Sequence, residues 1–193
     1  KIAQLLQERF SVPYLQGSYP VGWDNTICWL QNLGKFLQQE ALAEQIIANE
    51  KKRLEDFATQ VKRVTKGKRC VVCIGRMLMY FHPGGVLETL QRLGLEVEAI
   101  ILFDNYSAKE KKLMTEAIQA QCQLPIISAD EGQQLLESTD LVLTTHEITN
   151  NQELRQIFLP MLPLVGVSGE IEFMDCIYKT LCRRGQKGGI VYV

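Results

Sequence analysis

Two histidines and six cysteines supply the imidazole and thiol groups that could bind a metal ion or support redox chemistry in this sequence. His146 directly follows an apolar run that predicts a β-strand, whereas His82 lies in a loop that contains proline and glycine. A lone histidine is more often a surface or hydrogen-bonded residue than a ligand. His146 is the better functional candidate because a residue just past a strand is well placed to meet a ligand.

The cysteines do not predict a metal site. Cys70 and Cys73 lie three apart within one predicted strand, so their side chains face opposite sides of the sheet and cannot share an ion. Cys176 and Cys182 lie six apart on a predicted helix, about 600° of rotation, and also diverge. Most of the six fall in apolar stretches, which is typical of reduced, buried thiols in a cytoplasmic protein rather than of a disulfide framework.

From residue 67 onward, apolar runs alternate with amphipathic segments. Strands are predicted at 70–74, 97–103, 125–127, 141–143 and 162–167, and helices between them at 86–93, 108–121, 131–137, 152–158 and 171–183. Ser107 and Ser128 each precede a glutamate by three residues, which predicts capping boxes at two helix starts. Uniformly apolar strands between amphipathic helices favour an α/β, doubly wound, mostly parallel Rossmann-like sheet with right-handed crossovers.

The first 66 residues have a different pattern. Apolar spacing predicts an opening helix, then a short strand at 12–15, and then a helix that Asp24 can cap. A longer helix at 41–64 combines an apolar stripe with a charged face. The sequence therefore predicts two parts: the end of a preceding domain plus a helical connector at 1–66, and a Rossmann-like C-terminal domain at 67–193.

A doubly wound sheet binds ligands beyond the carboxyl ends of its strands. That rule makes cofactor-binding candidates of Gly75, Arg76, Thr144, His146 and Ser168. Any loop at that edge would qualify, so position alone does not identify a ligand. The glycine spacing of a dinucleotide or phosphate loop is missing after the first strand, so neither NAD nor ATP is indicated.

Charge and hydropathy exclude two classes of partner. The 21 basic and 22 acidic side chains nearly cancel, so no basic field is available to hold nucleic acid. No apolar run approaches the roughly 20 residues of a membrane helix. The sequence does not begin with Met and stops on an apolar run, from which we expect a fragment of a longer protein.

Two segments resemble the nitrogenase component 1 type oxidoreductase superfamily. Residues 12–22, Val-Pro-Tyr-Leu-Gln-Gly-Ser-Tyr-Pro-Val-Gly, resemble a passage that closes the middle domain of those proteins. Residues 67–72, Gly-Lys-Arg-Cys-Val-Val, resemble the entry into their last Rossmann-like domain. Shorter matches follow in order at 93–97 and at 140–142. The resemblance covers nearly the whole chain, although it is built from many short matches.

The resemblance implies an iron–sulfur or other metallocluster in the parent protein, a paired homologous subunit and an ATP-dependent iron protein. The family's cluster cysteines would precede residue 1, so this chain is not expected to bind a metal itself. Ser168 stands near the position of a cofactor histidine and cannot replace an imidazole ligand. Arg76 could meet an acidic cofactor or propionate group, or form a surface salt bridge.

The leading functional hypothesis is the C-terminal portion of a nitrogenase-like oxidoreductase subunit that forms one wall of a cofactor or substrate pocket. The isolated chain would then be inactive. A non-catalytic scaffold for metallocofactor assembly is one alternative. A small-molecule-binding Rossmann-like domain without a redox role is another.

Overall fold

The computed structural model describes residues 2–15, 17, 19–75, 83–103, 107–120, 122–148, 154–159, 164–183 and 190–192. Its helices are α1 (Ile2–Phe10), α2 (Trp23–Phe36), α3 (Glu40–Thr65), α4 (Pro83–Arg92), α5 (Ala108–Gln119), α6 (Ala129–Ser138) and α7 (Gly166–Cys182). Its strands are β1 (Arg69–Ile74), β2 (Glu96–Leu102), β3 (Ile126–Ser128), β4 (Leu141–Thr144), β5 (Gln156–Phe158) and β6 (Ile190–Tyr192).

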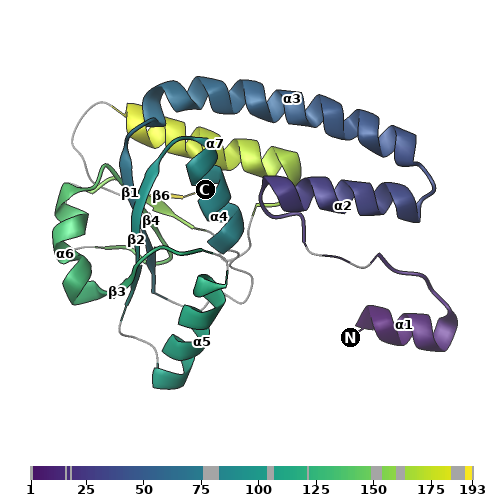
Figure 1. Ribbon diagram of the computed structural model, residues 1–193, viewed down its shortest axis with the longest axis horizontal. Coiled ribbons are helices and arrows are strands. Elements are labelled where there is room, and N and C mark those ends of the chain that lie inside the picture. The colour runs from purple at the N-terminus through teal and green to yellow at the C-terminus, as the bar shows by residue number, and fades with distance from the viewer. Residues whose placement is uncertain are drawn as a thin grey trace.

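The strands form one sheet in the order β3-β2-β1-β4-β5-β6, and each neighbouring pair is parallel. This is the strand order of doubly wound dinucleotide-binding folds, in which the direction of strand addition reverses at one point of the sheet. Here the reversal lies between β1 and β4 (Figure 1). The predicted α/β, doubly wound parallel fold is confirmed.

Alternate residues of each strand pack on opposite faces of the sheet. Cys70, Val72 and Ile74 of β1 belong to the larger core cluster, under α3, α4, α5 and α7. Val71 and Cys73 belong to a smaller cluster on the other face, to which α6 contributes. The two thiols therefore face apart, as the strand spacing predicted. The sheet is covered on both faces, but more heavily on the first.

The last crossover departs from the predicted handedness. The connection β1–α4–β2 steps towards β3, whereas β5–α7–β6 steps the opposite way along the sheet. Both helices pack on the same face, in the larger cluster. Parallel connections that step in opposite directions over one face have opposite hands, so the prediction that all crossovers are right-handed is wrong.

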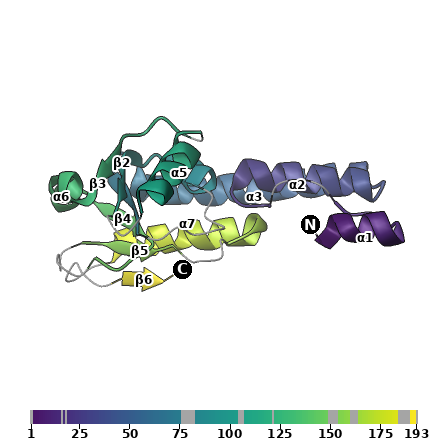
Figure 2. The ribbon, with the colours of Figure 1, turned by 90° about the horizontal axis from the view of Figure 1, so that it is seen from below.

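The helices before β1 pack against the sheet-covering helices. Trp23 of α2 and Leu54 and Val61 of α3 lie in the larger core cluster, and α3 runs beside α7 over much of its length (Figure 1). Figure 2 shows α2 and α3 extending together away from the sheet, with α1 below their far end. Lys66 and Gly67 form the turn between α3 and β1. The division into two parts at this turn stays a prediction.

Several local predictions hold and several fail. Ser107 and Ser128 form the two expected capping boxes, and the long helix is present as α3. Residues 12–15 are not a strand. Asp24 does not cap α2, whose N-cap is Gly22 with a φ of 80° and no side-chain cap. None of the described helices is long and apolar enough to cross a membrane.

The pattern between β4 and α7 was also misread. Where the sequence predicted a helix at 152–158, its described end is strand β5. Where it predicted a strand at 162–167, residues 166 and 167 begin α7. The reason for the first error is Gln156, a buried polar residue. Its side-chain Nε2 donates to the Ile148 carbonyl, and its Oε1 accepts from the Ile148 backbone amide, each at a distance of 2.9 Å. A satisfied buried amide reads as a surface position in a sequence pattern.

Candidate functional site

Gly75 and Thr144 lie at the carboxyl ends of β1 and β4, the two strands between which the strand order reverses. Backbone and side-chain hydrogen bonds join the two strand ends. The Thr145 amide donates to the Cys73 carbonyl over 3.0 Å, and the Gly75 amide donates to Thr145 Oγ1 over 2.8 Å. The two predicted candidates are therefore brought together at the position where folds of this strand order bind ligands.

The imidazole of His146 lies directly against Gly75. A Cβ atom at residue 75 would lie 2.6 Å from Nδ1 and 2.8 Å from Cγ of His146, and 3.1 Å from Cδ2 of Phe103. The two separations from the imidazole are shorter than real Cβ contacts, so the histidine can occupy this place only because residue 75 is glycine. The glycine is required here by space, because its backbone does not have a positive φ.

Thr144 is hydrogen-bonded to the backbone of His146. Its Oγ1 accepts from the His146 amide over 3.0 Å and donates to the His146 carbonyl. Thr144 is itself completely buried. The hydroxyl thus both donates and accepts a hydrogen bond within the turn, and these two bonds hold the backbone of the histidine.

Nδ1 of His146 is buried and has no hydrogen-bond partner within the described part of the chain, while the residue as a whole is partly exposed. A buried polar atom without a partner costs roughly 1–3 kcal/mol. Unsatisfied buried polar atoms are uncommon in native proteins, so this nitrogen calls for a specific explanation.

Two helix starts each hold a carboxylate from their own first turn. In α5 the box satisfies the amides of Ser107 and Glu110, and in α6 it satisfies those of Ser128 and Glu131. In each box the hydrogen bonds from the serine lower the pKa of the glutamate. The positive end of each of these helices therefore already has a negative charge of its own, which disfavours a phosphate or carboxylate ligand there.

The remaining predicted candidates do not join this cluster. Ser168 is exposed in the first turn of α7, where the amide of Gly166 donates to the Pro20 carbonyl over 2.8 Å. The side chains that would meet a Cβ at Gly75 are those of His146 and Phe103, not that of Ser168. Arg76 lies outside the described residues.

Sequence reasoning did not predict that the carboxyl group of Glu170 is buried. Glu170 of α7 is 7% exposed, and its Oε1 is hydrogen-bonded to the hydroxyl of Thr89 on α4. Burial raises its pKa to about 7, against the opposing effect of the Thr89 hydrogen bond. The signal was available, because Glu170, Phe173, Met174 and Ile177 share the helical spacing of one buried stripe.

The described residues do not fit direct ligation of a metallocluster. They contain no group of three or more His, Cys, Asp or Glu side chains that could hold a metal ion. Burial raises the pKa of Cys70 and of Cys73 to about 12. A thiol must lose its proton to bind iron or zinc, and these two are held in the protonated form.

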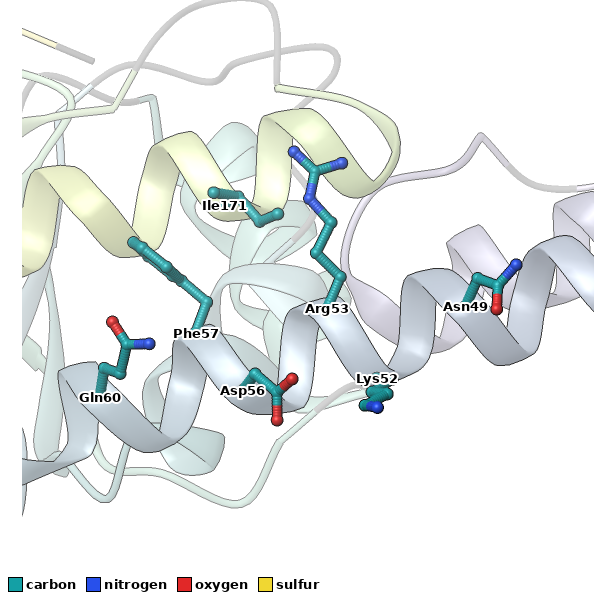
Figure 3. Close-up of a pocket in the computed structure, with 7 residues that line it drawn as sticks. All are labelled: Asn49, Lys52, Arg53, Asp56, Phe57, Gln60 and Ile171. Atoms are coloured by element: carbon teal, nitrogen blue, oxygen red, sulfur yellow. The ribbon is translucent and has the colours of Figure 1, made fainter.

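A separate hollow of about 450 Å³ lies between α3 and α7 (Figure 3). Phe57 and Arg53 extend from α3 towards α7, where Ile171 faces them, while Lys52 and Asp56 point away from α7. Asn49 and Gln60 complete the lining. None of the predicted candidates lines it. Its mixed charges and exposed cations do not define one ligand class.

Comparisons with known proteins agree with this architecture. Over 112 residues the chain is 30% identical to the nitrogenase vanadium-iron protein beta chain of Trichormus variabilis, an overlap that covers 56% of this chain and 22% of that protein. The solved structure of nitrogenase Cp1 at pH 5 superposes with a TM-score of 0.64 at 14% identity and covers 94% of this chain and 44% of the other. Nitrogenase Cp1 at pH 6.5 gives a TM-score of 0.62 at 13% identity, covering 93% and 46%.

The chain thus spans less than half the length of each of these relatives. The structural likenesses lie under 25% identity and establish the fold. The model of one family, nitrogenase component 1 type oxidoreductase, matches residues 1–182 of the 193. Because that match covers nearly the whole sequence, the chain belongs to the nitrogenase component 1 type oxidoreductase family.

Proposed function

We propose that the chain is the C-terminal portion of a cytoplasmic, nitrogenase-like oxidoreductase subunit, and that its edge at Gly75 and His146 forms part of a cofactor or substrate pocket. The observation that carries the proposal is the placement of His146 against Gly75, at the point between β1 and β4 where the strand order reverses. In open α/β sheets that position is the ligand crevice. Family membership supplies the redox context.

The metallocluster of such a protein would be bound by other parts of the assembly. The thiols of Cys70 and Cys73 are buried, protonated and on opposite faces of the sheet. A paired homologous subunit and an ATP-dependent iron protein would be the partners that supply and pass electrons. This chain's contribution is then to shape and orient a bound group, not to hold its metal.

His146 would act through its imidazole. Thr144 fixes the backbone of the histidine, and Gly75 lets the ring lie close to the strand end. A ring held in this way can donate or accept one directed hydrogen bond to a cofactor edge or a carboxylate. Since little conformational freedom is left to lose, such a contact is pre-organised.

Two measurements test the proposal. The isolated chain, mixed with a family iron protein, ATP and a reductant, should reduce no substrate, and measurable reduction would contradict the placement of the clusters elsewhere. In the second, imidazole NMR signals are followed while a propionate-bearing tetrapyrrole or a synthetic iron–sulfur cluster is added. We expect the His146 signal to shift and the signal of His82, the matched control, to stay. His82→Gln and His146→Gln assign the two signals, and equal shifts of both would count against the pocket.

A scaffold for metallocofactor assembly is the second candidate. Ser168 favours it, because an exposed hydroxyl in the first turn of α7 cannot bind iron as an imidazole would. A scaffold would release its cluster to an acceptor protein without turning over substrate. Cluster transfer without substrate reduction by the assembled subunit would therefore favour the scaffold over the enzyme.

A further inference from the structure

The carboxyl group of Glu170 is buried where three helices come together. Glu170 belongs to α7, its Oε1 is hydrogen-bonded to the hydroxyl of Thr89 on α4, and the start of α2 packs against both helices (Figure 1). A buried carboxylate is costly unless it is fully paired, whereas the neutral acid is not. The proton of Glu170 therefore affects how these three helices fit together.

The hydroxyl of Thr89 indicates which form of Glu170 the structure holds. Its Oγ1 also donates to the carbonyl of Gly85 over 3.1 Å, and a carbonyl oxygen can only accept. A hydroxyl has one proton, so both bonds exist together only if the carboxyl group of Glu170 donates to Thr89. This is the arrangement of the neutral acid. An ionised Glu170 would take the Thr89 proton and leave the Gly85 carbonyl without this bond.

Gly85 is also the place where α4 meets the chain that leads into α2. A Cβ atom at Gly22 would lie 2.8 Å from Cα of Gly85, and a Cβ atom at Gly85 would lie 3.1 Å from the carbonyl oxygen of Val21. Backbone packs on backbone here, with no side chain between. Because such a contact has no slack, a movement of Gly85 is passed directly to the chain entering α2.

Charge provides a second connection between Glu170 and α2. Arg92 of α4 lies 2.9 Å from Oδ1 of Asp24 and 2.9 Å from Oε1 of Glu88, and its guanidinium is 4.5 Å from the ring centroid of Trp23. The charge of Arg92 favours the ionised form of Glu170, and the charge of Glu88 opposes it. An ionised Glu170 would therefore compete with Asp24 for Arg92.

The environment places the change of form near neutral pH. Burial is the largest effect and raises the pKa of Glu170 to about 7. On α3, the other helix that packs against α7, Arg53 extends towards α7 beside Ile171, while Asp56 points away from α7 (Figure 3). The charges closest to the carboxyl group are thus those of α4 and of the α2 start that is paired to it.

We propose that Glu170 is a proton-dependent switch at the junction of α2, α4 and α7. As the neutral acid it donates to Thr89, and the chain at Gly22 stays docked on Gly85. As the carboxylate it takes the Thr89 proton and competes for Arg92, and the start of α2 separates from α4 and admits water to the charge. The switch does not involve the proposed ligand pocket, and it makes the position of the chain that leads into α2 depend on pH.

Nuclear magnetic resonance on the full chain between pH 5 and pH 9 tests the switch. The indole N–H signal of Trp23, whose ring lies against Arg92, should move with a midpoint close to the pKa of Glu170, about 7. The signal of Trp29, further along α2, should not follow that midpoint.

Hydrogen exchange measures the docking itself and does not depend on any variant folding. The amide of Gly166 on α7 donates to the carbonyl of Pro20 over 2.8 Å. Its protection, corrected for the intrinsic exchange rate, should fall at least ten-fold above the midpoint. The amide of Thr145, which donates to the Cys73 carbonyl within the sheet, should keep its protection.

Three variants separate Glu170 from other titrating groups. Glu170→Gln is neutral at every pH and should keep the acid form of the Trp23 signal throughout. Thr89→Val should raise the midpoint, because the hydrogen bond to Thr89 lowers the pKa of Glu170 and is stronger to a charged acceptor. Glu172→Gln, at an exposed position two residues further along α7, is the matched control and should titrate as the wild type does.

Four results would overturn the proposal. These are a Trp23 signal and a Gly166 protection that do not respond to pH, a Trp23 titration that persists in Glu170→Gln, an unchanged midpoint in Thr89→Val, and a titration that is lost in Glu172→Gln.

Discussion

Lys68 and Asp140 form a direct link between the amino ends of β1 and β4. Nζ of Lys68 lies 3.0 Å from Oδ1 of Asp140, and the amide of the next residue, Arg69, donates to Oδ2 over 3.0 Å. The two residues come from sequence segments more than 70 positions apart, both of which carry the family resemblance. Their link fixes the register of the two central strands at the edge opposite Gly75 and His146.

Replacing Asp140 by Asn should weaken this link. Partial burial acts to raise the pKa of Asp140, but the Arg69 amide and Lys68 outweigh it and lower the pKa. The carboxylate therefore stabilises the fold above its unfolded pKa, and this contribution is lost as the pH falls through the lowered value. Because the pair is partly exposed, we expect Asp140→Asn to cost about 1 kcal/mol at pH 7. Urea unfolding should show that the difference in unfolding free energy between the wild type and the variant becomes smaller in acid. The same difference at every pH would contradict the prediction.

Glu170 should give the protein an opposite pH dependence. Its pKa is raised to about 7, chiefly by burial, so the folded state holds a proton that the unfolded chain releases above its ordinary value of 4.5. The stabilisation is complete below pH 4.5 and is lost as the pH rises to about 7. We expect Glu170→Gln to be more stable than the wild type at pH 8 by up to about 3 kcal/mol.

The measurement for Glu170 is denaturant unfolding at a series of pH values from 4 to 8. The neutral glutamine can still reach the Thr89 hydroxyl, so the variant should lack this part of the pH dependence. Glu172→Gln, at an exposed position two residues further along α7, is the control and should follow the wild type. A wild-type profile in Glu170→Gln would show that the buried carboxyl does not titrate in this range.

Gly75→Ala should destabilise the protein through His146. The added methyl group would lie 2.6 Å from Nδ1 of the imidazole, and overpacking of this kind costs about 1–3 kcal/mol. In a His146→Ala background most of that cost should disappear, because the two shortest contacts are with the imidazole. A double-mutant cycle from unfolding free energies gives the coupling; additive costs would mean that the two residues are not in contact.

The six thiols should fall into separate reactivity classes. Cys28 and Cys182 are exposed, whereas Cys70 and Cys73 are buried and their pKa values are raised to about 12, first of all by burial. Only the thiolate reacts with alkylating reagents. Mass spectrometry after brief iodoacetamide treatment at pH 8 should find Cys28 and Cys182 modified, and Cys70 and Cys73 modified only after unfolding. Early modification of Cys70 or Cys73 would show that β1 is not buried.

The elements were predictable where the signal is local. The apolar run of β1, the capping boxes at Ser107 and Ser128 and the stripe of α3 each depend on residues within a few positions of one another. The errors arose where a distant contact changes the meaning of a residue. Gln156 reads as polar surface but is buried by its bonds to Ile148, and Asp24 pairs with Arg92 of α4 instead of capping α2.

The sequence by itself determined the α/β alternation, the opposite facing of Cys70 and Cys73, and the strand ends at which Gly75, Thr144 and His146 lie. Only the tertiary structure decided that His146 lies on Gly75, that Thr144 serves the histidine's backbone, and that Glu170 is buried while Ser168 is exposed. The spacing of apolar residues fixes which face of an element is apolar, because this pattern depends only on residues within one helix or strand. Which elements become neighbours depends on strand order and on the face that each crossover takes, and these follow from packing the whole core at once.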